Sequence, residues 1–368
     1  MKILQLVTRR QYRGAEVAAA TFSEEFIRLG HDVIFAGLYN KPENPLTVAG
    51  ALNVDIHASQ RFFSLGGFWR LWKLIKREKP HVLHANGSDT LKYLVAVKIL
   101  MPSCKVVYRN ISVISHWRGA NRLKNRFYDS LFRKVDFVTS VGDTSRNDFI
   151  KTLKFPESRI AVVKRGIRIP KQVGENADLK KSLGIKPDQH VLIHVGNFSP
   201  EKNHVFLINA FAGIRSHGVQ AVLLLAGDGV LKTEIENQVS TLGLNKDIFF
   251  LGLKKDITPY LAISDLIVLT SKVEGVPGVL LEAAAQGVPA VAVNVGGVGE
   301  SVLHAETGML VGGADRDAFG STVIQLLSRS DERARLGSNA RQFVKENHDL
   351  EQGARKFLGI FEALVNNA

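Results

Sequence analysis

The sequence predicts an α/β protein built from two doubly wound, Rossmann-like domains. Three observations support this prediction. The chain has 368 residues, enough for two domains that each bury their own core. Short runs of almost entirely apolar residues recur along it, and segments of helical periodicity lie between them. Such runs are typical of parallel strands that helices cover on both faces.

The apolar runs are the predicted strands, and they are rich in branched side chains that suit a pleated, buried surface. In the first half of the chain they are 2–7, 32–38, 81–85, 105–109, 137–141 and 160–164. In the second half they are 190–196, 221–227, 248–252, 266–270, 290–293 and 309–313.

A polar segment, 169–190, separates the two halves and carries Pro170 and Pro187, so we interpret it as a linker with a short helix. The tail from about Asp331 onward has helical periodicity and no strand pattern. We therefore expect an N-terminal domain over 1–168, a C-terminal domain over 169–345, and a terminal helix over 346–368.

Composition narrows the class of protein. Hydrophobic residues make up 45% and charged residues 23%, as in soluble globular proteins. No run reaches the roughly 18 apolar residues that a membrane-spanning helix needs. MKILQLV at the start is predicted to be a first strand and not a signal peptide. A single cysteine, Cys104, excludes an internal disulfide, argues against a zinc site and fits a reducing compartment.

The net charge of +13 is unevenly distributed. Residues 1–170 hold 29 Lys and Arg against 13 Asp and Glu, whereas residues 171–368 hold 19 against 22. A basic first half predicts a polyanion or an anionic membrane surface as its partner.

Much of that charge falls in two amphipathic segments, 68–81 and 118–136. Their apolar residues at helical spacing are Phe68, Leu71, Trp72 and Ile75, and Leu123, Phe127 and Leu131. Their cations include Arg70, Lys73, Lys76, Arg77, Arg122, Lys124 and Arg126. Packing explains most of the apolar residues but not the surplus cations. With Trp69 and Trp72, these cations suit docking on an anionic leaflet. Nucleic acid is the competing use of such charge, but no recognised binding module is present.

The chain lacks the phosphate-binding motifs of several nucleotide-dependent classes. The segment TRRQYRGAE (8–16) after the first strand has one glycine, so no G-x-G-x-x-G opens the first helix. No P-loop is present either. A dinucleotide-dependent dehydrogenase and a P-loop enzyme are therefore disfavoured.

The segment SKVEGVPGVLLEAAAQGVPAVA (271–292) carries two glutamates, Glu274 and Glu282, with seven residues between them. Pro277 is expected at the first helical position and Gly287 just past the helix end. Glu274 then lies in the loop before the helix, and Glu282 about a turn and a half into it.

This helix start is a candidate anion site. Small residues over 275–279 leave backbone N–H groups exposed at the positive end of the helix, which suits phosphate, and the two carboxylates can accept from sugar hydroxyls. A glutamate near a helix start often only caps it or faces water. The neighbouring turns favour a ligand site, because each follows a predicted strand, where open α/β sheets bind ligands. These turns are GNFSPEKN (196–203) with Lys202, AGDGV (226–230), and GGVGE (296–300) with Glu300.

Together the motifs resemble the family 4 glycosyltransferases, which have the GT-B fold. The resemblance covers most of the chain and is strongest over 191–311. It rests on RGAE (13–16), GNFSPEKN, AGDGVL (226–231), FLG (250–252), the Glu-x7-Glu segment with its following GVP, and GGVGE. It implies two Rossmann-like domains facing a central cleft, with the nucleotide sugar on the C-terminal domain and the acceptor on the N-terminal one. The terminal helix is then expected to pack back on the N-terminal domain.

The resemblance also implies residue roles. Lys202 corresponds to the lysine that holds the donor diphosphate, Glu274 to the glutamate that contacts the transferred sugar, and Glu282 to the one that binds the ribose. The implied donor-binding set is Gly14, Gly196, Asn197, Lys202, Glu274, Gly275, Val276, Pro277, Gly278, Val279 and Glu282. Because fixed cations and amides stabilise a diphosphate leaving group, no metal ion or cofactor is expected.

The chain departs from the family pattern in three places. Asn197 stands where an arginine usually follows Gly196, and Arg165 stands where asparagine is common. Arg165 either replaces the missing charge or is a solvated linker residue. A histidine that often follows the fourth strand is absent, and His116, several residues later, is either a catalytic base or an exposed loop residue.

The predicted catalytic residues are thus Glu274, Lys202 and His116. The candidate residues on the acceptor side are Arg13, Glu16, His84 and Arg109, of which His84 is either an acceptor contact or a structural histidine.

The resemblance implies a cytoplasmic, retaining, metal-independent glycosyltransferase, peripheral at the inner face of the plasma membrane. The donor is expected to be UDP-linked and the acceptor a glycan or lipid-linked molecule in envelope polysaccharide or lipopolysaccharide synthesis. Nucleic acid is not an expected partner. Two alternatives remain: a sugar-nucleotide epimerase on the same fold, and a non-catalytic membrane-binding protein with a decayed site, which Asn197 suggests.

Overall fold

The computed structural model describes residues 1–59, 63–118, 121–170, 177–313 and 315–366. The chain forms two compact units: unit 1 is Met1–Gly166 with Leu350–Ala368, and unit 2 is Ile167–Asp349. The predicted boundary between 168 and 169 lies two residues beyond the observed one, and unit 2 extends four residues past the predicted end at 345.

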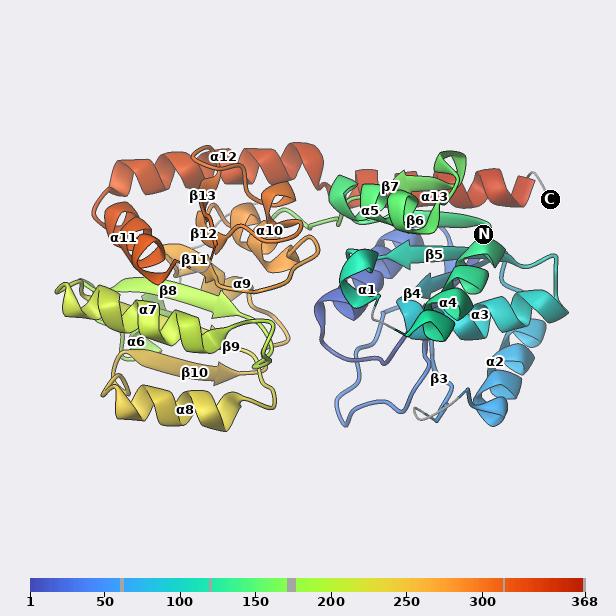
Figure 1. Ribbon diagram of the computed structural model, residues 1–368, viewed down its shortest axis with the longest axis horizontal. Helices are drawn as coiled ribbons and strands as arrows, with labels where there is room; N and C mark the ends of the chain where they lie inside the picture. The colour runs from blue at the N-terminus through green and yellow to red at the C-terminus, as the bar shows by residue number, and fades with distance from the viewer. Residues whose placement is uncertain (60–62, 119–120, 171–176, 314, 367–368) are drawn as a thin grey trace. The chain divides into compact units, whose positions relative to one another are not determined.

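Unit 1 contains a seven-stranded sheet whose order is β3-β2-β1-β4-β5-β6-β7, with every neighbouring pair parallel (Figure 1). The strands are β1 (Lys2–Val7), β2 (Asp32–Gly37), β3 (Leu52–Asp55), β4 (Val82–Asn86), β5 (Lys105–Asn110), β6 (Phe137–Ser140) and β7 (Ile160–Val162). All six predicted strands are present. The strand β3 was not predicted, because it is a four-residue edge strand in which no residue is fully buried and the apolar run is short.

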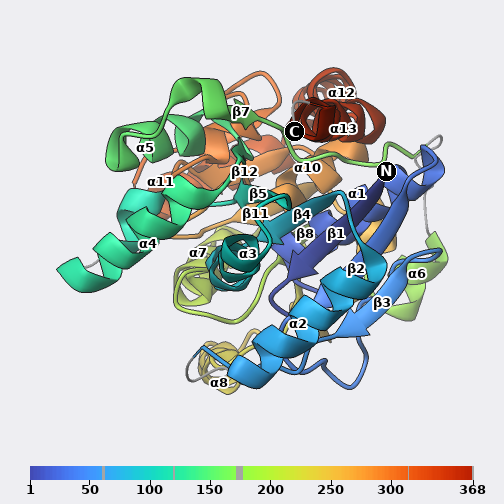
Figure 2. The same ribbon diagram turned by 90° about the vertical axis from the view of Figure 1, so that its right-hand side faces the viewer.

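Helices cover both faces of this sheet. They are α1 (Gly14–Arg28), α2 (Leu65–Glu78), α3 (Ser88–Leu100), α4 (Arg122–Lys134), α5 (Asp143–Leu153) and α13 (Leu350–Asn366), with the short 3₁₀ helices η1 (Ile114–Trp117) and η2 (Glu157–Arg159). Alternate residues of β1 show the two layers. Leu4 and Leu6 join the core under α2 to α5, and Ile3 joins the core under α1 and α13. Figure 2 shows α3 between α2 and α4 on the first of these faces.

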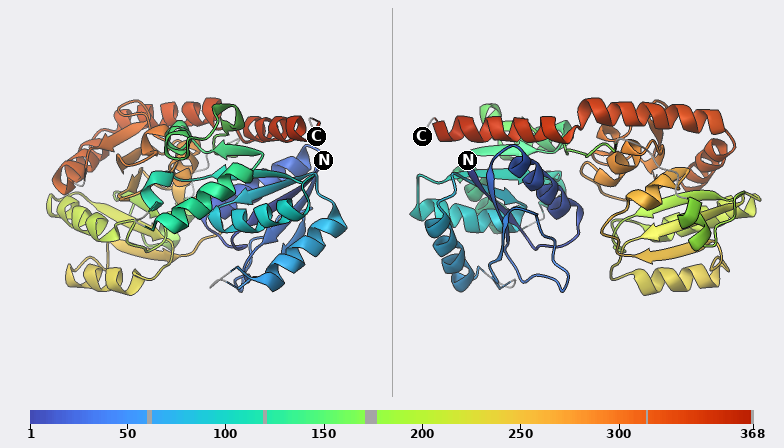
Figure 3. Two further views of the ribbon diagram at one scale, coloured as in Figure 1. Left: turned by 45° about the vertical axis from the view of Figure 1, so that its right-hand side comes forward. Right: turned by 180° about the vertical axis from the view of Figure 1, so that it is seen from behind.

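The terminal helix α13 belongs to unit 1, where it lies beside α1 (Figure 3). The ring of Phe357 meets that of Phe22 edge to face, with centroids 4.9 Å apart, and Phe361 packs on Phe26 at 6.0 Å. Arg28 adds ion pairs to Glu25 and to Glu351 at the start of α13. Aromatic packing of this kind explains why the tail returns to the first unit.

Unit 2 contains a six-stranded parallel sheet of order β10-β9-β8-β11-β12-β13 (Figure 1). The strands are β8 (His190–Val195), β9 (Ala221–Ala226), β10 (Ile248–Gly252), β11 (Leu266–Leu269), β12 (Ala290–Val293) and β13 (Gly308–Val311), all of them predicted. The helices are α6 (Ala177–Ser182), α7 (His204–Ser216), α8 (Lys232–Thr241), α9 (Thr258–Ala262), α10 (Gly278–Ala285), η3 (Val298–Glu300), α11 (Arg316–Leu327) and α12 (Ser330–Asn347). Of the predicted linker 169–190, residues 171–176 lie outside the described part.

Both sheets reverse their strand order once, between β1 and β4 in unit 1 and between β8 and β11 in unit 2. Loops that leave the carboxyl ends of the strands diverge at such a point, and this is where open α/β sheets bind ligands. A ligand site is therefore expected at the loops after β1, β8 and β11. Within the described residues, no helix has the length and apolar character required to cross a bilayer.

Candidate active site

The loop after β8 presents the first predicted site residue. Gly196 and Asn197 open it, and Lys202 is its penultimate residue before α7. Asn203 adopts a left-handed conformation at the cap of α7, which turns the chain sharply after Lys202. The side chain of Lys202 retains 24% exposure and its ammonium group reaches the neighbouring loop.

The loop after β11 presents the second. One oxygen of Glu274, Oε1, accepts a hydrogen bond from Lys202 Nζ at 2.5 Å and another from Ser271 Oγ at 2.6 Å. The Glu274 side chain is only 10% exposed. Lys202 and Glu274, to which the sequence analysis gave separate partners, thus form an ion pair with each other at the switch point of the sheet.

Further hydrogen bonds connect the two loops. The amide of Lys272 donates to the carbonyl oxygen of Glu201 at 2.7 Å. Thr270 Oγ1, at the end of β11, donates to the carbonyl oxygens of Lys202 and Asn203 at 3.3 and 3.4 Å. These bonds hold the backbone on either side of the ion pair, so the pair is positioned by the scaffold as well as by its own attraction.

Two glycine-containing turns, AGDGV (226–230) and GGVGE (296–300), pack closely against the backbone of these loops. A Cβ on Gly227 in the AGDGV turn would lie 2.0 Å from the carbonyl oxygen of Gly196. A Cβ on Gly296 in the GGVGE turn would lie 2.0 Å from the carbonyl oxygen of Glu274, and Gly296 has a φ of +54°. Only glycine permits both approaches. These turns were predicted to belong to a ligand site, and in the structure they pack against the backbone of Gly196 and Glu274.

Helix α10 begins at Gly278, with Pro277 as its N-cap at φ −71° and ψ 106°. The prediction that Pro277 is the first helical residue is therefore wrong by one position, because its extended ψ keeps it outside the helix. No side chain caps the first turn, which leaves its amide groups for a ligand. Gly275 and Val276 precede Pro277, and Val279 lies within the helix.

Glu282 lies in the second turn of α10 and is half-buried. Gly287 follows the last residues of the helix with a φ of +76°, as predicted. The two glutamates therefore lie at different depths, one in the loop and one on the helix. Their roles toward a donor remain predictions.

Two histidines beneath the first loop were missed by the sequence analysis. His194 on β8 and His204 at the start of α7 meet edge to face, with ring centroids 4.7 Å apart, and Phe198 stacks on His204 at 4.2 Å. Burial, together with the Lys202 charge, lowers the pKa of His204 to about 4. Burial likewise lowers the pKa of His194, whose Nδ1 bonds to the carbonyl oxygen of Val268 at 2.9 Å. Both rings are neutral at physiological pH and pack beneath Lys202.

In unit 1, the loop after β1 leads into α1, whose first residue is Gly14. Arg165 Nη1 donates to the carbonyl oxygen of Gly14 at 3.2 Å. Arg13 is exposed, whereas Glu16 is buried and accepts from Gln11 Nε2 at 3.3 Å. Burial raises the pKa of Glu16.

Two of the remaining candidates in unit 1, His84 and Arg109, are buried. His84 is fully buried against Phe357 and Phe361 of α13, and burial lowers its pKa to about 3. His84 is thus a neutral core residue in this structure, as the structural alternative expected, and an acceptor contact by it remains a prediction. Arg109 is also buried, beside Phe357. His116 is exposed on η1, and its role as a base remains a prediction.

No group of three His, Cys, Asp or Glu in the described ranges is arranged to hold a metal ion.

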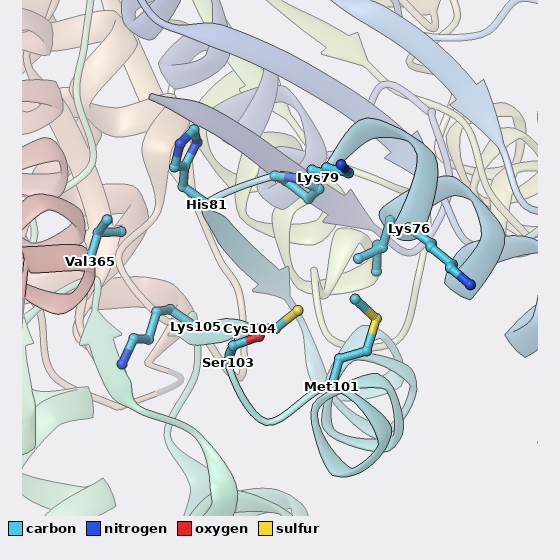
Figure 4. A pocket seen from close by; sticks show the side chains of 10 residues that line it. Lys76, Lys79, His81, Met101, Ser103, Cys104, Lys105 and Val365 are labelled. Carbon is cyan, nitrogen blue, oxygen red and sulfur yellow. The ribbon is translucent and has the colours of Figure 1, made fainter. Parts of the chain in front are cut away.

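Unit 1 contains a cavity of about 420 Å³ on the amino-terminal side of its sheet, where β4 and β5 begin and α2 and α3 end. Figure 4 shows the sulfur atoms of Met101 and Cys104 toward its centre and the ammonium groups of Lys76 and Lys105 directed outward. This cavity is separate from the loops described above.

Two family profiles together match most of the chain. The profile of Glycosyltransferase Family 4 matches residues 12–169, and that of Glycosyl transferases group 1 matches residues 175–343. The chain is 36% identical over 301 residues to N-acetyl-alpha-D-glucosaminyl L-malate synthase of Bacillus anthracis, a match that covers 79% of this chain and 77% of the relative. The chain belongs to glycosyltransferase family 4.

Other family relatives act on different molecules by their names. This family 4 glycosyltransferase is 25% identical to the UDP-Gal:alpha-D-GlcNAc-diphosphoundecaprenol alpha-1,3-galactosyltransferase of Escherichia coli, over 81% of this chain and 79% of the relative. Among solved structures, Anabaena HepE in complex with UDP and glucose has a TM-score of 0.82 at 21% identity, covering 99% of this chain and 100% of HepE. WaaG, a glycosyltransferase involved in lipopolysaccharide biosynthesis, has a TM-score of 0.78 at 18% identity, covering 98% and 99%. The predicted GT-B fold is confirmed.

Proposed function

We propose that this glycosyltransferase transfers a sugar, with retention of configuration, from a UDP-linked donor to a glycan or lipid-linked acceptor at a membrane surface. The observation that carries the proposal is the Lys202–Glu274 pair beside the uncapped start of α10, at the switch point of the unit 2 sheet. A cation and free amide groups suit a diphosphate, and a carboxylate suits sugar hydroxyls.

The chemistry follows from the charge that develops on the leaving group. When the glycosidic bond breaks, negative charge grows on the diphosphate, and the Lys202 ammonium and the first-turn amides of α10 stabilise it. Glu274 holds the transferred sugar through its hydroxyls, and Glu282 holds the ribose. In the proposed front-face attack, a donor phosphate oxygen accepts the proton of the acceptor hydroxyl, so neither a metal ion nor a protein nucleophile takes part.

A UDP-linked donor is supported by the relatives. The E. coli relative takes UDP-Gal by its name, and HepE holds UDP and UDP-glucose in its structures. The sugar that this chain prefers is open to direct assay.

A membrane setting is supported by α4. Packing was expected to bury most apolar residues of the two basic segments, and in α2 it does bury Phe68, Leu71 and Ile75. In α4 it buries Leu131, but it leaves Leu123 81% and Phe127 51% exposed. The exposed cations beside them are Arg122, Lys124 and Arg126. An exposed helix with apolar and cationic side chains suits the surface of an anionic leaflet.

Two relatives support the biosynthetic setting. The acceptor in the name of the E. coli relative is a diphosphoundecaprenol lipid, and WaaG belongs to lipopolysaccharide synthesis. We therefore propose envelope polysaccharide or lipopolysaccharide synthesis at the inner face of the plasma membrane.

A second candidate function is transfer of N-acetylglucosamine to a small hydroxy acid. It is favoured by the B. anthracis relative, whose name gives L-malate as acceptor and which is 36% identical to this chain. This candidate requires no membrane.

Acceptor assays separate the candidates. The purified chain is incubated with radiolabelled UDP-GlcNAc, UDP-galactose or UDP-glucose and with either L-malate or a polyprenyl-diphosphate-linked sugar. Label in the lipid fraction supports the first proposal, and label in glycosyl malate supports the second.

Two controls test the remaining alternatives. Donor incubated without acceptor would yield an epimer if the protein were an epimerase. The Glu274→Gln variant measures background, and equal activity in wild type and variant would exclude a catalytic role for this site.

A further inference from the structure

The cavity on the amino-terminal side of the unit 1 sheet has an apolar interior. Ile75, Pro80 and Cys104 are buried in its wall, and Met101 and Val365 are half-buried there. The sulfur atoms of Met101 and Cys104 lie toward its centre (Figure 4). Its volume of about 420 Å³ falls within the range of small-molecule sites, about 300–1,000 Å³. An apolar group is therefore favoured as the occupant of the interior.

The backbone in two walls of this cavity is already hydrogen-bonded within the protein. At the end of α2, the amide of Lys79 donates to the carbonyl oxygen of Ile75 at 2.9 Å. In the turn before β5, the amide of Cys104 donates to the carbonyl oxygen of Met101 at 3.0 Å. A polar group that entered the cavity would lose its hydration and would have to compete with these bonds. Only the apolar part of a ligand is therefore expected inside.

Three lysines line the same cavity. They are Lys76, Lys79 and Lys105, and His81 lies with them, whereas no aspartate or glutamate is among the described residues of the lining. The ammonium groups of Lys76 and Lys105 are directed outward (Figure 4). None of the three lysines forms an ion pair with another described residue. The cavity thus combines an apolar interior with cations at its edge.

The end of α2 accounts for two of these lysines but not for the third. Lys76, in the last turn, and Lys79, at the C-cap, lie at the negative end of the helix, where cations are favourable. Lys105 instead begins β5. Glu78, the acidic residue of α2, is paired with Lys2 at 3.3 Å. The three ammonium groups therefore retain the capacity to bind an external anion.

We propose that this cavity binds a single-chain anionic amphiphile, with a phosphate or carboxylate head at the lysines and an alkyl chain among the apolar side chains. Charge complementarity selects the head, and the apolar interior selects the chain. The site lies at the end of the unit 1 sheet opposite the loop after β1, and it does not depend on the proposed function. An anionic membrane lipid and a free alkyl phosphate share this chemistry.

Isothermal titration calorimetry of the full-length protein with monomeric decyl phosphate tests the proposal. UDP is present throughout, so that the proposed donor site in unit 2 is occupied. We expect saturable binding to wild type. Decanol carries the same chain without the charge, and it is expected to bind at least about tenfold more weakly because it makes no charge-assisted contact with the lysines.

A double variant, Lys79→Met with Lys105→Met, removes two ammonium groups and keeps the apolar stems of the side chains. The Kd for decyl phosphate should rise at least about tenfold, whereas the Kd for decanol should stay unchanged. The matched control is Lys151→Met with Lys186→Met, which lowers the net charge equally at two exposed lysines that do not line the cavity. Its Kd for decyl phosphate should equal that of wild type.

The Cys104→Phe variant tests the interior of the cavity. The sulfur of Cys104 lies toward the centre, so a larger side chain there fills the space while the three ammonium groups remain (Figure 4). Decyl phosphate and decanol should both bind at least about tenfold more weakly, because the space for the chain is lost. The variant with Leu123→Ser and Phe127→Ser, which alters only exposed residues of α4, should bind both ligands as wild type does.

Sedimentation with phosphatidylglycerol vesicles distinguishes the two sources of the amphiphile. Weaker attachment of the double lysine variant than of its matched control supports a membrane lipid. Equal attachment of the two, together with weaker binding of decyl phosphate by the double lysine variant in the calorimeter, supports a free amphiphile.

Three outcomes would overturn the proposal. The first is the absence of saturable decyl phosphate binding to wild type. The second is equal affinity of wild type for decyl phosphate and decanol, a result that requires no variant to fold. The third is an unchanged Kd for decyl phosphate in the double lysine variant, which would place the ligand elsewhere on the protein.

Discussion

At the level of single side chains, Lys202 and Glu274 compensate each other before any donor binds. A carboxylate that is 10% exposed would be costly without a partner, and the ammonium group provides one. In the proposed donor site, phosphate groups would therefore compete with Glu274 for Lys202. The sequence predicted both residues, but it could not reveal the pairing, because 71 residues lie between them and only the loops after β8 and β11 bring them together.

Replacing Lys202 with alanine should weaken binding of UDP and of the donor. Loss of a charge-assisted contact costs about 1.5–3 kcal/mol, which corresponds to roughly a 10- to 150-fold rise in Kd. Isothermal titration calorimetry with UDP measures it. Lys232→Ala, which removes a surface ion pair with Glu236 on α8, should leave Kd unchanged and serves as control. Equal affinity in wild type and Lys202→Ala would remove Lys202 from the donor site.

The two glutamates should separate kinetically. Glu274→Gln is expected to lower kcat far more than it weakens UDP binding, because its carboxylate is assigned to the transferred sugar. Glu282→Ala is expected to weaken UDP binding and to change kcat less. Steady-state kinetics and calorimetry on both variants test this. Parallel losses in the two variants would show that the division of roles is wrong.

His204 predicts a pH dependence of stability. Its pKa falls from 6.5 to about 4 on folding, so the unfolded chain takes up a proton that the folded chain resists. The stability that depends on the neutral ring is therefore present above about pH 6.5 and is lost as the pH falls toward 4, by at most about 1.4 kcal/mol per pH unit. The urea midpoint of wild type should drop more between pH 7 and pH 5 than that of His204→Leu. His217→Leu, at an exposed histidine after α7, should match wild type. Identical slopes in wild type and His204→Leu would contradict the assignment.

At the level of elements, strand prediction succeeded wherever a strand is buried on both faces, because the sequence is then continuously apolar. It failed for β3, whose edge position requires no such run. The start of α10 was misplaced by one residue, since the φ of proline suits both a cap and a first turn. The supporting roles of Gly227 and Gly296 depend on loops that approach from distant parts of the chain, and no local pattern reports such an approach.

Gly296→Ala should displace the loop that carries Glu274. The added Cβ would lie 2.0 Å from the carbonyl oxygen of Glu274, at a φ of +54° that alanine disfavours. We expect a lower thermal midpoint together with loss of transferase activity. Gly213→Ala in α7, where a Cβ meets nothing within 4 Å, should be neutral or slightly stabilising. Full activity in Gly296→Ala would show that the turn does not fix the loop.

At the level of the whole molecule, the basic half predicted from composition corresponds closely to the chain segment that makes up most of unit 1. Counting charges located this basic half but could not reveal that Leu123 and Phe127 are exposed within it. Periodicity indicates which side of a helix is apolar, but it does not encode which turns of that side another element covers.

The protein should therefore bind anionic vesicles reversibly and neutral vesicles much less. Each cation near such a surface contributes about 1 kcal/mol, and screening weakens it as the Debye length falls from about 10 Å at 0.1 M to about 3 Å at 1 M salt. Vesicle sedimentation across this salt range measures it. A variant with Leu123→Ser and Phe127→Ser should bind less at every salt concentration. Equal binding to neutral and anionic vesicles would refute the electrostatic attachment.

The cavity at the amino-terminal side of the unit 1 sheet makes the reactivity of Cys104 a probe of local opening. Cys104 lines it, is buried, and is the chain's single thiol. Burial raises its pKa, so in the closed state it reacts slowly with alkylating reagents. Val365 of α13 forms part of the same wall. Local opening of unit 1, including departure of the end of α13, would therefore increase the rate at which the Cys104 thiol is alkylated. The alkylation rate of this one thiol thus reports on fraying of the terminal helix.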